Sequence, residues 1–172
     1  IDLRTPVAQT LRSDGRNDTT AGGGFVTLAT LDFSENAVGS AFDDVIQGSI
    51  QSNKLVGGNG DDTLVGHESN DTIFGGDGID ILDYSQETGT IQILVDLEAE
   101  TATDTHGDTD TISEIEHGIG CDITVFDDIF GDEGKNTFTG NGGVNVDQMD
   151  GRGGTDAVDY SRETGNDLPD GV

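Results

Sequence analysis

The chain has no tryptophan, one cysteine, two prolines and only seven lysines and arginines among its 172 residues. A lone Cys121 excludes an internal disulfide. The seven cations are scattered, so the chain lacks the basic patch that nucleic acids or anionic membranes require. The longest apolar run, Ile91 to Leu97, is interrupted by Gln92 and Asp96 and is far too short to span a bilayer. Since the chain starts at Ile1 and has no signal peptide, we expect a piece of a longer protein.

Acidic residues, in contrast, are abundant. The chain carries 35 aspartates and glutamates, which give a formal net charge of -28 at pH 7, while apolar residues make up only 31%. This combination is typical of disordered chains. It is equally typical of a fold in which bound cations separate the carboxylates, because such self-repulsion destabilises a compact state. Composition alone does not choose between the two.

A nine-residue repeat favours the second interpretation. Five units follow one another without a break: GSAFDDVIQ (39–47), GSIQSNKLV (48–56), GGNGDDTLV (57–65), GHESNDTIF (66–74) and GGDGIDILD (75–83). Position one is always glycine, position six is Asp44, Asn53, Asp62, Asp71 or Asp80, and position eight is Ile46, Leu55, Leu64, Ile73 or Leu82. Internal repeats with a short fixed period are typical of solenoids.

The three repeated positions have simple physical roles. The glycine-rich half of each unit predicts a turn, and the aliphatic residue at position eight predicts a short strand with one buried face. Two units then complete one coil, so residues eighteen apart stack on the same edge. Asp44, Asp62 and Asp80 share one edge, and Asn53 and Asp71 share the other. Stacked carboxylates next to turn carbonyls suit a hard dication with six to eight oxygen ligands, which favours calcium.

The units GGNGDDTLV and GGDGIDILD resemble the repeat-in-toxin (RTX, haemolysin-type calcium-binding) nonapeptide, G-G-x-G-x-D followed by an apolar residue. The resemblance implies an all-β, calcium-bound parallel β-roll, with each ion held between two turns eighteen residues apart. It implies three sites here: Gly58, Gly60 and Asp62 with Gly75, Asp77 and Asp80; Ser40, Phe42 and Asp44 with Gly57, Asn59 and Asp62; and Ser49, Gln51 and Asn53 with Gly66, Glu68 and Asp71. Asn53 and Gln51 depart from the family pattern, so the third site is expected to be weaker.

A second, more degenerate array follows. The heptapeptide DYSQETG at 83–89 returns as DYSRETG at 159–165, and units can be aligned from 122 to 159 around a two-residue insertion. Two further calcium sites are expected: Asp132, Gly134 and Asn136 with Gly151, Gly153 and Asp156; and Asp127 with Gly140, Gly142 and Asn145. We therefore expect two tandem rolls that hold about five calcium ions in all. The expected boundaries are a β segment at 1–38, a first roll at 39–85, a connecting β segment at 86–121, a second roll at 122–161 and a flexible tail at 162–172.

Other motifs do not indicate catalysis. His67-Glu68 begins like the metalloprotease motif H-E-x-x-H, but Asp71 stands where the second histidine is required, so we interpret both residues as filling variable turn positions. DTHGDTD at 104–110 has Thr109 where an EF-hand requires glycine, and it has no flanking helices. It is predicted to be a solvated acidic turn, with a single peripheral calcium ion as the alternative. Paired acids such as Asp43 and Asp44 are expected to serve the repeat rather than a glycosidase mechanism. The chain is therefore expected not to be an enzyme.

The function predicted from the sequence is a calcium-binding module of a secreted or bacterial surface protein. Such a module would fold on calcium outside the cell and serve a structural role, as in an adhesin, surface layer or filament. The resemblance implies type I secretion, and its partners would be calcium and neighbouring copies or modules. The alternative is a non-catalytic accessory module of an extracellular enzyme of the protease or alginate epimerase type, which could bind carbohydrate through Tyr84 or Tyr160.

Overall fold

The computed structural model describes residues 36–121, 126–141 and 147–161, and the backbone of 9–10 and 26–27. All regular elements in these ranges are strands, which form three sheets. The six-stranded sheet contains β4 (Val45–Gln47), β6 (Thr63–Val65), β8 (Ile81–Asp83), β12 (His117–Ile119), β14 (Thr137–Thr139) and β16 (Ala157–Val158). The eight-stranded sheet contains β3 (Asn36–Val38), β5 (Lys54–Asn59), β7 (Thr72–Asp77), β11 (Thr109–Ser113), β10 (Thr101–Thr103), β9 (Ile93–Asp96), β13 (Asp127–Phe130) and β15 (Gln148–Asp150). β1 (Gln9–Thr10) and β2 (Val26–Thr27) pair with each other.

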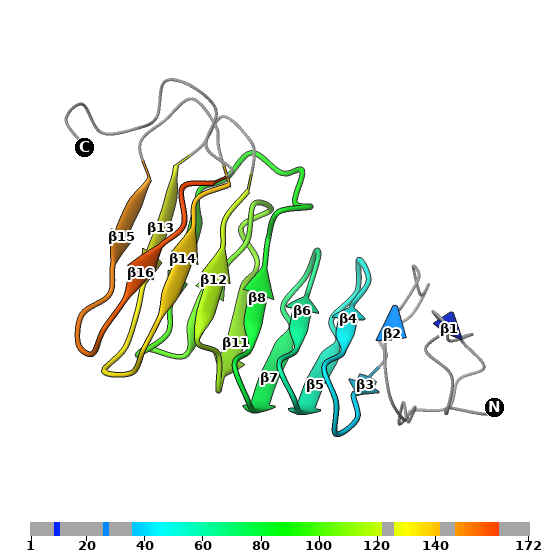
Figure 1. Cartoon of the computed structure of the whole chain (residues 1–172). Coiled ribbons are helices and arrows are strands. Elements are labelled where there is room, and N and C mark those ends of the chain that lie inside the picture. The colour runs from blue at the N-terminus through cyan, green and yellow to red at the C-terminus, as the bar shows by residue number, and fades with distance from the viewer. Residues whose placement is uncertain (1–8, 11–25, 28–35, 122–125, 142–146, 162–172) are drawn as a thin grey trace.

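The chain winds between the two large sheets in a regular coil, and the coils stack along one axis (Figure 1). From β3 to β8, consecutive strands alternate between the sheets, and each strand pairs in parallel with the strand two positions further on. Lys54 pairs with Thr72 and Thr63 pairs with Ile81, so one coil contains eighteen residues. The predicted all-β parallel β-roll, with two nonapeptides per coil, is confirmed.

A thin core of stacked aliphatic side chains runs between the two sheets. The side chains at position eight of the first array, Ile46, Leu55, Leu64, Ile73 and Leu82, are all fully buried. The same column continues through Phe138 and Ile129. Gly118 lies in register between Leu82 and Phe138, and a Cβ placed there would meet Ile129 Cγ2 at 3.0 Å. The glycine therefore leaves room for the side chain of Ile129 on the opposite sheet.

The segment expected to connect two rolls joins the same two sheets. β9, β10 and β11 form an antiparallel meander, β11 pairs in parallel with β7, and β9 pairs in parallel with β13. On the other face, β12 pairs in parallel with both β8 and β14. The strands before and after this segment therefore belong to continuous sheets (Figure 1). No helix that could cross a membrane occurs in the described part of the chain.

Candidate metal centre

Position-six side chains form a hydrogen-bonded ladder along the first edge of the roll. The amide of Asp44 donates to Asp62 Oδ1 (2.7 Å), and the amide of Asp62 donates to Asp80 Oδ1 (2.8 Å). The amide of Asp80 donates to Glu116 Oε2 (2.8 Å), and further along the edge the amide of Asn136 donates to Asp156 Oδ1 (3.0 Å). Each of these side-chain oxygens thus accepts a backbone N–H from the preceding coil and holds the two turns together.

The second edge repeats this arrangement. The amide of Asn53 donates to Asp71 Oδ1 (2.7 Å), and the amide of Asp71 donates to Asp110 Oδ1 (2.8 Å). Beyond the meander, the amide of Asp127 donates to Asp147 Oδ1 (2.9 Å). Position six therefore places one side-chain oxygen of each ladder residue on the neighbouring coil.

The turns are of two kinds, which differ in the hydrogen bonding of Oδ2, the second oxygen of each ladder carboxylate. In the turns that begin at Gly39 and Gly120, it accepts the backbone N–H of position two: Ser40 donates to Asp44 Oδ2 (2.6 Å), and Cys121 donates to Asp127 Oδ2 (2.9 Å). In three other turns, Asp62 Oδ2, Asp71 Oδ2 and Asp80 Oδ2 are buried and have no hydrogen-bond partner among the described residues. These three oxygens are available to a cation, and so is Asp44 Oδ1, which is also buried without a hydrogen-bond partner among the described residues.

The backbone at position two explains the difference. Gly58 and Gly76 both have φ of 121°, and His67 has φ of 70°, in the left-handed region. The N–H of position two does not bond to the carboxylate in these three turns. Glycine adopts this conformation without steric cost, which accounts for the second glycine of the G-G-x-G-x-D pattern.

Position one requires glycine for a different reason, which is space. A Cβ on Gly66 would lie 2.5 Å from Asp71 Oδ2, and a Cβ on Gly75 would lie 2.6 Å from Asp80 Oδ2. The carboxylate of each turn therefore folds back over the first glycine of the same turn. A side chain at position one would push the carboxylate out of the turn.

Burial leaves these carboxylates poorly solvated. It raises the pKa of Asp62 and Asp80 to about 6 and that of Asp71 to about 8, and the neighbouring acids add to the effect. A buried carboxylate with a free oxygen is stabilised by a bound cation or by protonation. The oxygen-only donors at these turns, carboxylates and backbone carbonyls, are those that calcium prefers. The residues therefore fit the calcium ion that the repeat implies.

A comparison with protein-family models agrees with this geometry. Residues 31–58 and 47–82 match the RTX calcium-binding nonapeptide repeat, with four copies in all. The chain carries RTX repeats. A comparison with curated proteins gave no match. The RTX roll is a calcium-binding module, and proteins with these repeats are typically secreted by bacteria.

The structure brings together the turns of the three sites predicted in the first RTX array. Gly58 and Asn59 pair with Gly76 and Asp77, so the turns at 57–62 and 75–80 stack directly. The ladder bonds stack 39–44 on 57–62, and 48–53 on 66–71. In the second array, Gly153 donates its N–H to Asp132 O (3.0 Å), which places 131–136 against 151–156. Binding of calcium by these particular residues stays a prediction.

One predicted site lies partly outside the described residues. Asn145 was expected opposite Asp127, but Gly142 and Asn145 lie outside the described residues, and Asp147 holds the ladder position. β15 pairs Gln148 with Asp128, so the two-residue insertion lies between these two positions. The described strands on either side of the insertion stay in parallel register.

The structure adds ladder residues that the repeat alignment missed. Glu116 lies 36 residues after Asp80, a multiple of nine, so extending the spacing across the connecting segment would have found it. Asp110 lies 39 residues after Asp71, and no multiple of nine predicts it.

The turn at 104–110 also differs from the prediction. It was expected to be solvated, but Asp104, Thr105 and Asp110 are fully buried. Tyr84 Oη donates to Asp110 Oδ2 (2.7 Å), and Ser69 N donates to Asp108 Oδ2 (3.0 Å). The turn therefore packs on the neighbouring coil, which removes Asp104 and Asp110 from water.

Proposed function

We propose that this RTX roll folds when it binds calcium outside the cell and then serves as a structural segment of a secreted or surface protein. The observation that carries the proposal is the set of buried, unpartnered oxygens on Asp62, Asp71 and Asp80. Without an ion, each carboxylate loses its hydration on folding and gains no compensating partner for one oxygen.

Calcium supplies the missing partner. About five ions would change the formal charge from -28 to about -18, and would do so where the carboxylates are most crowded. Because the sites exist only when the coils are stacked, binding and folding are coupled. In the cytosol calcium is scarce, so the chain would stay unfolded and suitable for type I secretion. Extracellular calcium would then fold it.

The test is a circular dichroism titration of the full chain. In chelator we expect a disordered spectrum, and millimolar calcium should convert it to a β spectrum. Magnesium should act poorly, because it requires a tighter octahedron of ligands. A β spectrum that persists unchanged in chelator would contradict the proposal.

We favour a structural, non-catalytic role over a carbohydrate-binding accessory module. Of the two tyrosines that could stack on a sugar, Tyr84 is fully buried and donates its hydroxyl to Asp110. Tyr160 is 46% exposed and stays available. Binding of alginate or related uronate oligosaccharides to the calcium-loaded chain, lost in Tyr160→Ala, would favour the accessory module instead.

A further inference from the structure

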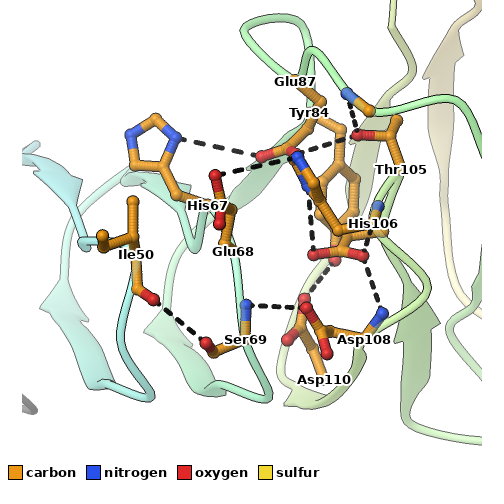
Figure 2. A network of polar contacts seen from close by, with 12 residues as sticks. Ile50, His67, Glu68, Ser69, Tyr84, Glu87, Thr105, His106, Asp108 and Asp110 are labelled. Atoms are coloured by element: carbon orange, nitrogen blue, oxygen red, sulfur yellow. Dashed lines mark hydrogen bonds and ion pairs between the residues drawn. The ribbon is translucent and has the colours of Figure 1, made fainter.

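A second cluster of metal-binding side chains lies beside the calcium edge, outside the repeat. Glu87 comes from the corner after β8, and Asp104 and His106 come from the turn between β10 and β11. Their candidate ligand atoms all lie within 4.8 Å of one another. Figure 2 shows His106 and His67 on two sides of the Glu87 carboxylate.

The distances suit one small ion. His106 Nδ1 lies 3.3 Å from Glu87 Oε2 and 4.0 Å from Asp104 Oδ2. Zinc bonds of about 2.0–2.2 Å in a tetrahedral site place the donor atoms about 3.3 Å apart. His67 Nδ1 lies 3.9 Å from Glu87 Oε1, the other oxygen of that carboxylate, and belongs to the neighbouring calcium turn at 66–71.

Both carboxylates are buried and each keeps one oxygen without a hydrogen bond. The side chains of Glu87 and Asp104 are 1% and 0% exposed. Glu87 Oε1 and Asp104 Oδ2 have no hydrogen-bond partner among the described residues. Asp104 Oδ2 lies 4.0 Å from His106 Nδ1, and Glu87 Oε1 lies 3.9 Å from His67 Nδ1, whereas Glu87 Oε2 is the oxygen nearest to His106 Nδ1.

The other oxygens are held by the surrounding turn. Asp104 Oδ1 accepts the N–H groups of His106 and Asp108, each at 2.9 Å. Glu87 Oε2 accepts the hydroxyl of Thr105 (3.1 Å), whose Oγ1 in turn accepts the N–H of Gly89 (2.9 Å). Outer contacts of this kind orient metal ligands before the ion arrives.

The electrostatic surroundings also favour a cation. Burial raises the pKa of the Glu87 and Asp104 carboxyls, because it penalises their charged form. Within the described ranges, no lysine or arginine forms an ion pair with either carboxylate. A dication would neutralise two buried charges at once.

We propose that Glu87, Asp104 and His106 bind a first-row transition dication of the zinc type, at a site separate from the calcium turns. Calcium prefers oxygen ligands throughout, whereas imidazole with carboxylates suits zinc and its neighbours. The site would clamp the corner at 84–89 onto the turn at 104–108, and so fix the meander against the coils of the first array.

The experiment is isothermal titration of Zn²⁺ into the full chain with calcium in large excess. We expect one zinc ion per chain, and we expect His106→Gln and Glu87→Gln each to weaken its binding by more than about 10-fold. His117→Gln is the matched control, because His117 is a half-buried histidine on β12 outside the cluster. It should leave zinc affinity unchanged.

Calcium-induced circular dichroism is recorded on every variant, so loss of the zinc site is distinguished from loss of the fold. Cobalt replaces zinc in a second measurement, and its visible spectrum should show nitrogen and oxygen ligation that His106→Gln removes. Absence of zinc binding to a folded chain would overturn the proposal. So would equal weakening by His106→Gln and His117→Gln, or competitive displacement of zinc by calcium.

Discussion

At the scale of single residues, the conformation of position two decides whether Oδ2 of the carboxylate in the same turn is free. Where it is Ser40, its N–H bonds to the carboxylate of Asp44. Where it is Gly58 or Gly76, φ is positive and the carboxylate of Asp62 or Asp80 keeps a free oxygen. The strongest calcium sites are therefore expected at the turns from 57 to 80, which are also the closest matches to the family repeat.

Substitution of Asp62 tests this directly. Asp62 is fully buried and shared by two proposed sites, so Asp62→Asn should raise the calcium concentration at the folding midpoint by about 10-fold or more, because a charged ligand becomes neutral. Asp43→Asn is the control, since Asp43 is exposed and occupies a variable turn position. Equal shifts of the midpoint in circular dichroism titrations would mean that the register of the sites is wrong.

The raised pKa values predict a pH dependence. The folded-state pKa is about 6 for Asp62 and Asp80 and about 8 for Asp71, against 3.8 in the unfolded chain. Between about pH 4 and pH 8 the calcium-free fold therefore binds more protons than the unfolded chain, so its stability falls as the pH rises. Calcium competes with these protons.

We expect the calcium midpoint to rise when the pH is lowered from 8 to 5, while the chelator-treated chain gains β structure over the same range. Titrations by circular dichroism at fixed pH values measure both. A calcium midpoint that does not depend on pH would show that the buried carboxylates stay ionised.

At the scale of elements, the short strands are stabilised by the buried side chains that stack between neighbouring coils. β14 consists of three residues, and its Phe138 is 1% exposed beside Gly118. Removing the ring would leave a cavity that neighbouring coils cannot fill. Phe138→Ala should therefore lower the free energy of unfolding of the calcium-loaded chain by about 3–5 kcal/mol.

Phe126→Ala is the matched control, because Phe126 is 48% exposed and should change stability by no more than about 0.5 kcal/mol. Thermal unfolding in saturating calcium measures both variants. Similar losses would mean that Phe138 does not belong to the core.

Much of this arrangement could be predicted from the sequence, because a period of nine fixes both the core column and the ladder. The residues that break the period could not. Asp110 is 39 residues from Asp71, and Asp147 follows an insertion whose position only strand pairing reveals. Glu87 and His106 belong to no nonapeptide unit, and their proximity depends on how the meander folds back on the first array.

At the scale of the whole molecule, the two arrays form one stack. Besides the continuous sheets, Arg152 binds Asp96 through two hydrogen bonds of 2.6 and 2.7 Å, across 56 residues of sequence. Repeats that contact only their neighbours fold cooperatively when the interfaces between them are intact. We expect one calcium-dependent transition for both arrays.

Fluorescence of Tyr84 and Tyr160 and circular dichroism at strand wavelengths should therefore follow the same calcium titration curve. Arg152→Met should leave the single transition in place, because this ion pair is exposed and contributes little. Two separated transitions in the unaltered chain would instead mean that the arrays are independent units.

The coil of eighteen residues also determines how the molecule responds to tension. When the chain is pulled at its ends, the bonds between neighbouring coils are loaded one coil at a time, as in a zipper, rather than all together as in a sheet sheared along its strands. Each coil released would lengthen the chain by roughly 60 Å, given about 3.4 Å per residue. Stretched by an optical trap in calcium, the roll should therefore yield at low force in regular steps and rewind when the load is removed.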